Sequence, residues 1–157
     1  MGLSLKKDEM IKFLQEIKAD GETFSCMLWG VCYAKLPIFE NRSTASIIML
    51  FSLRPGVAGT IDNAFCYIGI TQKSLYVIAL DAYNTSKVIS SFAVPFTSIN
   101  SLKMKKGMTG SYTVDVESEG NIRLVVKSTS LGTDIKDQKE RLTGFVVQIE
   151  ALQESLA

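Results

Sequence analysis

The stretch that decides the fold is YIGITQKSLYVIALD, residues 67–81, in which two apolar runs flank a polar tetrad that begins at Thr71. A two-residue turn inside the tetrad lets the runs pair so that their apolar side chains share one face. The central pair Gln72-Lys73 is not among the favoured residues for such a turn. The sequence therefore predicts an antiparallel hairpin in which the cross-strand pairs are Ile70 with Leu75, Ile68 with Val77, and Gly69 with Tyr76.

A second hairpin is predicted for SYTVDVESEGNIRLVVKS, residues 111–128. Apolar and polar residues alternate in both arms, so the apolar faces match only if the connecting loop has an odd number of residues. The segment Glu119-Gly120-Asn121 fits, because Gly and Asn tolerate the left-handed conformation. The pairs expected from this loop are Val116 with Leu124, Val114 with Val126, and Glu117 with Arg123.

Further strands and two helices surround these hairpins. ETFSCMLWGVCYA is typical of one long strand that bends near Gly30, and VISSFAV is typical of a strand that ends at Pro95. A strand is expected to follow Pro95 directly, with a bulge between Ile99 and Leu102. An N-terminal helix is predicted for 4–19, with Ser4 as its cap. A C-terminal helix is predicted for 134–156, with Thr133 or Asp134 as its cap and an apolar stripe of Leu142, Phe145, Val146, Ile149 and Leu152.

The segment 36–63 combines turn residues with the apolar run ASIIMLFSL. Periodicity does not separate a buried strand from a buried helical turn in so short a run, and a strand or an inserted segment is the interpretation adopted. A peripheral segment with this many large apolar residues would leave one face exposed, which is typical of an interface. We therefore expect self-association through Ile47, Ile48, Met49, Leu50, Phe51 and Leu53. The alternative is a central strand buried within one chain.

These elements predict a single domain over residues 1–157, mainly β with flanking helices. An antiparallel barrel of about seven strands is expected over 22–130, with 36–63 as an insertion. The C-terminal amphipathic helix would cap one open end of this barrel, and the N-terminal helix would lie on a neighbouring surface.

Composition limits the chemistry that this chain can perform. The 157 residues carry a net charge of +1 and include no histidine, which excludes Ser-His-Asp units, Cys-His units and His-ligated zinc. The three cysteines form no CxxC pair and fit reduced thiols in a core. No apolar run reaches the length of a membrane span, and no secretory signal is present. We expect a cytoplasmic protein that is not an enzyme and uses no metal or other cofactor.

Two clusters of charged residues are candidate sites. Lys103, Lys105 and Lys106 precede Gly107 and could bind an anion, although lysines also protect a sheet edge against strand addition. The few aromatic residues nearby argue against nucleic acid. The acidic residues Asp115, Glu117 and Glu119 could line one face, but Arg123 and Lys127 lie across the hairpin, which favours a solvent-facing charge ladder over a cation site.

Several segments resemble the bacterial pleckstrin-homology-like domains. These are Gly21-Glu22 before the long strand, YIGITQKSLYVI at 67–78, VPFTSINSL at 94–102 and the C-terminal helix. Ile70 and Thr71 match the pattern of that family's hairpin, whereas Ser74 stands where a basic residue is usual. The resemblance implies a strongly bent seven-stranded barrel capped by the C-terminal helix, in a binding or scaffold module.

Function follows as an expectation from the fold and the composition. We expect a non-catalytic module that mediates protein–protein interaction or self-association. The alternative is a small barrel that binds a ligand or an anionic headgroup in a cavity or at the Lys103–Lys106 patch, with weak enzymatic chemistry. Some eukaryotic relatives bind lipid headgroups through clustered basic residues after the first strand. Here that region offers only Lys35 and Arg42, which argues against such binding.

Overall fold

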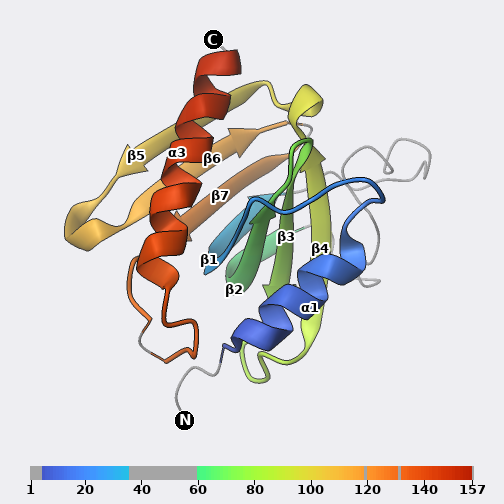
Figure 1. The fold of residues 1–157 in the computed structure, drawn as a ribbon, viewed down its shortest axis with the longest axis vertical. Coiled ribbons are helices and arrows are strands. Elements are labelled where there is room, and N and C mark those ends of the chain that lie inside the picture. The colour runs from blue at the N-terminus through green and yellow to red at the C-terminus, as the bar shows by residue number, and fades with distance from the viewer. Residues whose placement is uncertain (1–4, 36–59, 119, 131, 157) are drawn as a thin grey trace.

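The structure is a computed structural model that describes residues 5–35, 60–118, 120–130 and 132–156. Helix α1 (Lys7–Ile17) comes first, strands follow, and the long helix α3 (Gln138–Leu156) comes last (Figure 1). Two 3-10 turns flank β5, η1 (Phe96–Ser98) and η2 (Met108–Gly110). The strands are β1 (Cys26–Lys35), β2 (Thr60–Ile70), β3 (Ser74–Leu80), β4 (Val88–Pro95), β5 (Ser101–Lys106), β6 (Tyr112–Glu117) and β7 (Asn121–Val126).

In the described part of the chain, seven strands form one antiparallel sheet in the order β4-β3-β2-β1-β7-β6-β5. The two halves of the sheet meet at β1, which pairs with β2 from Cys26 to Lys35 but with β7 only from Val31 onward. Gly30 lies directly before the pairing with β7, and a Cβ atom there would be 2.8 Å from the backbone oxygen of Val125. In Figure 1 the strands β5–β7 cross the direction of β3 and β4, so the sheet is bent at β1.

The first half of the sheet is buried on both faces. Every residue of β3 is buried, and its side chains alternate between two apolar clusters. Leu75 and Val77 belong to the cluster that includes Phe145 of α3, whereas Tyr76 and Ile78 belong to the cluster that includes Leu14 of α1. Helix α1 covers the face of β3 that carries Tyr76 and Ile78. Both faces of the strand are therefore buried, which explains why residues 75–80 are apolar without alternation.

The predicted fold class is confirmed: the chain is mainly β, with an antiparallel sheet and a helix at each end. The hairpin of β2 and β3 has the predicted register, with Ile70 opposite Leu75, Ile68 opposite Val77, and Gly69 opposite Tyr76.

The turn of this hairpin is stabilised by side chains rather than by favoured turn residues. The Thr71 hydroxyl accepts the N–H groups of Lys73 and Ser74, at 3.2 and 3.1 Å, and donates to the buried carboxylate of Glu22 at 2.6 Å. The same Glu22 oxygen accepts the hydroxyl of Tyr76 at 2.9 Å. These contacts link the turn to the segment that joins α1 to β1.

The predicted register of the second hairpin is wrong by two residues. Val114 lies opposite Leu124, Val116 opposite Ile122, and Asp115, not Glu117, opposite Arg123. A shift of two leaves every side chain on its predicted face, so the apolar pattern does not distinguish the two registers. Polar contacts favour the observed register: Arg123 Nε donates to Asp115 Oδ1 at 2.7 Å, and the Ser118 hydroxyl donates to the backbone oxygen of Ser98 at 2.9 Å.

The strand predicted directly after Pro95 is interrupted, which corrects a second expectation. The turn η1 occupies this position, where the Ser98 hydroxyl donates to the backbone oxygen of Pro95 at 2.7 Å, and β5 begins only at Ser101. The break in alternation between Ile99 and Leu102 therefore marks the end of a turn rather than a bulge within one strand.

The start of the C-terminal helix also differs from the prediction. Helix α3 begins at Gln138, and Thr133 forms a turn ahead of it by accepting the N–H of Ile135 at 3.1 Å. Asp134 caps the other helix instead, because its Oδ1 accepts the N–H of Lys7, the first residue of α1, at 2.5 Å. The predicted cap Ser4 lies outside the described residues. The apolar stripe of α3 is as predicted: Leu142, Phe145 and Ile149 are core residues, with Val146 and Leu152 packed against them.

Asp137 links the two helices electrostatically, and this predicts a pH dependence. The Arg141 guanidinium, which donates to Asp137 at 2.9 Å, and the nearby Lys7 ammonium at 3.7 Å lower the pKa of the Asp137 carboxyl. A carboxyl with a lowered folded-state pKa stabilises the fold above its unfolded pKa of about 4, and this contribution is lost as the pH falls through the folded value.

We therefore expect Asp137→Asn to lower the free energy of unfolding at about pH 7, with the difference from wild type shrinking as the pH falls below the unfolded pKa of about 4 and through the lower folded value. Urea titrations at several pH values measure this difference. The matched control is Glu154→Gln at an exposed position of α3, the helix that follows Asp137, for which a small and pH-independent difference is expected. A difference for Asp137→Asn that does not change with pH would contradict the prediction.

The expectations for 36–63 lie mostly outside the described residues. Strand β2 begins at Thr60, so residues 60–63 belong to the sheet. Residues 36–59 are not described, and they include the six apolar residues expected to form an interface, Ile47 to Leu53.

Candidate binding surface

An open groove of about 820 Å³ lies against β1, β5, β6 and β7 and the start of β2. Two cross-strand rows of polar side chains form its floor. One row runs from Tyr33 through Arg123 and Asp115 to Lys103, and the next contains Lys35, Asn121, Glu117 and Ser101. The residues that alternate with them, such as Val116 and Ile122, point into the core. The groove therefore lies on the face of this half-sheet that is turned away from α3.

Six charged side chains line the groove, and among the described residues only two of them form an ion pair. Arg123 Nε and Asp115 Oδ1 are 2.7 Å apart, and the carboxylate raises the pKa of Arg123 above its ordinary value, chiefly through this hydrogen bond. No ion pair within the described ranges involves the other four, Lys35, Asp62, Lys103 and Glu117. As far as the described residues show, the groove thus presents charges of both signs without ion-pair partners around the paired Arg123 and Asp115.

Tyr33 adds an aromatic side chain at the β1 end of the groove. It is 38% exposed, and its hydroxyl donates to Asn63 Oδ1 at 3.1 Å. Strand β1 turns this ring outward because Cys32 and Ala34, on either side of it, are core residues. An exposed tyrosine beside an arginine is a common composition for the centre of a protein interface.

The predicted anion patch is only partly within the groove. Lys103 lines it, whereas Lys105 and Lys106 continue along β5 beyond its lining residues. The sequence pattern predicts that Arg123 and Asp115 belong to a solvent-facing charge ladder, and it does not single out Tyr33. The sequence does contain a feature that could identify Tyr33: it is an aromatic residue at an outward-facing position, between two residues of a strand that face the core.

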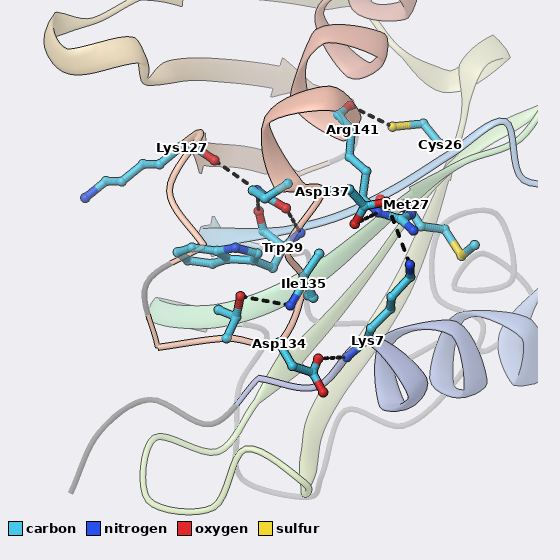
Figure 2. A network of polar contacts seen from close by, with 11 residues as sticks. Lys7, Cys26, Met27, Trp29, Lys127, Asp134, Ile135, Asp137 and Arg141 are labelled. Carbon is cyan, nitrogen blue, oxygen red and sulfur yellow. Dashed lines mark hydrogen bonds and ion pairs between the residues drawn. The ribbon is translucent and has the colours of Figure 1, made fainter.

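A polar network near the start of β1, at Met27 and Trp29, fixes the helices (Figure 2). The side chain of Gln138 donates to the backbone oxygens of Trp29 and Lys127, at 3.0 and 2.9 Å, and accepts the N–H of Trp29 at 3.4 Å. Figure 2 shows Arg141 next to Asp137 and Met27, and its Nη1 donates to the backbone oxygen of Met27 at 3.0 Å. The side chains of Gln138 and Arg141 thus bond to backbone groups of the protein itself. We interpret the network as a structural support that holds α3 against β1.

Potential nucleophiles have pKa values that disfavour their reactive forms. Burial raises the pKa of Cys26 to about 11, and burial together with the neighbouring Cys32 thiol raises that of Cys66. Burial likewise raises the pKa of Tyr67 to about 12. Thiols and phenols in this state are poor nucleophiles at neutral pH. Within the described ranges, no cluster of three or more Cys, Asp or Glu residues has an arrangement that could hold a metal ion.

No protein-family model matches the sequence, and no curated protein matches it. Two domains are among the solved structures that resemble the fold. The hSac2 domain from the human phosphoinositide phosphatase Sac2 aligns with a TM-score of 0.50 and 9% identity, covering 96% of this chain and 82% of that one. The pleckstrin homology domain of USP37 aligns with a TM-score of 0.42 and 6% identity, covering 83% of this chain and 99% of that one.

The fold is pleckstrin-homology-like. Its described strands and its C-terminal helix follow the architecture that the sequence resemblance implied, and the similarity to the hSac2 domain extends over nearly the whole chain. At 9% identity this similarity concerns the fold alone. A membrane-spanning helix, meaning one of sufficient length and apolarity, is not found in the part of the chain that the structure describes.

Proposed function

We propose that this chain is a non-catalytic binding module that recognises a protein partner through the groove on β1, β5, β6 and β7. The observation that carries the proposal is the combination, on one open face, of Tyr33, the Arg123–Asp115 pair and charges of both signs that have no ion-pair partner among the described residues. Complementary charges on a partner would select it and fix its orientation. The fold of this chain is one that hosts many binding functions in other proteins, and this analogy supports a binding role.

The lack of enzymatic activity is part of the same proposal. It is supported by the absence of histidine and by the raised pKa values of Cys26, Cys66 and Tyr67. Membership of the bacterial branch of the family and a cytoplasmic location are also proposed, the first from the sequence resemblance and the second from three free, buried cysteines.

Two further candidates have specific support. Binding of an anionic ligand at Lys103, Lys105 and Lys106 is favoured by three exposed lysines on a strand without acidic residues. Self-association through residues 47–53 stays a prediction from the apolar run alone, since those residues are not described.

Affinity capture with charge-reversed variants tests the groove. The chain is used as bait in an extract of its native source, and captured proteins are quantified for wild type and for Lys103→Glu/Arg123→Glu. We expect the double variant to retain a specific partner about tenfold less, because two charges at the contact change sign.

The matched control is Lys12→Glu/Lys139→Glu, which reverses two exposed lysines on the helices and should leave capture unchanged. Circular dichroism verifies that both variants are folded. If the groove variant and the control retain the same proteins in the same amounts, the proposed surface is wrong. A substrate turnover that depends on a single residue of the chain would overturn the non-catalytic assignment.

A further inference from the structure

Strand β5 forms one edge of the sheet. It pairs with β6 along its length, from Ser101 opposite Glu117 to Lys106 opposite Tyr112, and no described strand pairs with its other side. In Figure 1 β5 is the outermost strand of its half of the sheet. An edge strand of this kind presents unpaired backbone donors and acceptors to which another strand can add.

The hairpin geometry shows which backbone groups are available. The N–H of Gly107 donates to the backbone oxygen of Ser111 at 2.8 Å, which places this pair among the hydrogen-bonded pairs of the ladder. Because such pairs alternate along antiparallel strands, Lys103 and Lys105 bond to β6, whereas Leu102, Met104 and Lys106 direct their backbone groups toward the open edge. The open edge therefore offers three regularly spaced donor–acceptor sites.

The side chains of β5 determine which kind of strand can add to this edge. Lys103, Lys105 and Lys106 are exposed, the strand contains no acidic residue, and no ion pair of these lysines occurs within the described ranges. The nearest carboxylate across the ladder, Asp115, is held by Arg123. Two copies of β5 would place lysines against lysines, which disfavours pairing between identical chains.

We propose that the open edge of β5 binds an extended acidic segment of a protein partner, which adds to the sheet as an eighth strand. This inference rests on the proposed binding function and identifies its partner class. Acidic side chains at alternate positions of the added strand would lie beside Lys103 and Lys105. The residues between them would lie on the side of Leu102 and Met104 and would be apolar, since Met104 is half-buried against the core.

A peptide array provides the first test. It contains octapeptides in which Asp or Glu alternates with apolar residues, and a matched array replaces every acidic residue by Lys. We expect binding by the acidic array only, and a Kd for the best peptide that is about tenfold weaker for Lys103→Glu/Lys105→Glu. The control Lys12→Glu/Lys139→Glu should bind like wild type.

Two versions of the best peptide, N-methylated on one or the other set of alternate residues, separate strand addition from simple charge attraction. Only the version with its methyl groups on the edge facing β5 should lose binding. In the wild-type complex, amide exchange of Leu102, Met104 and Lys106 should slow at least about tenfold, whereas that of Lys103 and Lys105 should change little.

Equal binding of both N-methylated peptides, or unchanged exchange at Leu102, Met104 and Lys106, would overturn strand addition. Absence of binding to the whole acidic array would also overturn it. If affinity capture still yields a partner that depends on Lys103 and Arg123, the groove function stands and only the β5 inference fails. If capture yields no such partner, the proposed function fails as well.

Discussion

Phe145→Ala is expected to lower the free energy of unfolding by about 3–5 kcal/mol, because it removes a fully buried aromatic ring and leaves a cavity. Phe145 is 0% exposed and belongs to the core cluster that joins α3 to the inner face of the sheet. Removing its ring should weaken the attachment of the whole helix. Urea or thermal unfolding monitored by circular dichroism measures the change.

The control is Val147→Ala, two residues further along the same helix, where the side chain is 59% exposed. A surface change of this kind should alter stability by no more than about 0.5 kcal/mol. Equal effects of the two substitutions would show that Phe145 does not anchor α3 to the sheet.

Gln138→Leu should also destabilise the fold strongly, by about 3 kcal/mol or more, since it leaves several buried backbone groups without partners at about 1–3 kcal/mol each. Pairing of β1 with β7 begins at Val31, so Trp29 has no strand partner on that side among the described residues. The Gln138 amide takes the place of a peptide group there, bonding to both backbone groups of Trp29 and to the backbone oxygen of Lys127.

Chemical unfolding of Gln138→Leu and of Gln15→Leu tests this role. Gln15 is an exposed residue of α1, so its replacement by an apolar residue of the same size should have little effect. A Gln138→Leu protein as stable as wild type would mean that water or a rearranged backbone satisfies the groups of Trp29 and Lys127.

The sequence predicts individual hairpins well where both faces of a strand constrain the register. In the hairpin of β2 and β3 a shift of two residues would move Gly69 away from Tyr76 and disturb the packing of Phe24, whose ring lies where a Cβ of residue 69 would be, at 2.4 Å. The hairpin of β6 and β7 has only one apolar face. Its register depends on Ser118, Ser98 and the Asp115–Arg123 pair, which no alternation pattern reveals.

The candidate site was less predictable because its residues come together only through the sheet order. Tyr33, Arg123 and Lys103 belong to β1, β7 and β5, and the sequence does not show that β7 lies between β1 and β6. The role of Gln138 was missed for a similar reason: a single glutamine at the start of a polar helical turn carries no signal of burial. Three neighbouring lysines were visible in the sequence, but only the strand order shows that they lie at an open edge.

The central place of β1 has a consequence for how the chain reaches this fold. One side of β1 pairs with β2, which follows it in the sequence. The other side pairs with β7, where Val31 lies opposite Val125, so this pairing forms only after most of the chain is available. Closing so long a loop costs entropy before any contact compensates for it, and folds dominated by such distant pairings reach their native state slowly. During synthesis the first four strands can assemble while β1 still has a free side. We expect this half-sheet to be the species most prone to aggregation until the last third of the chain has emerged.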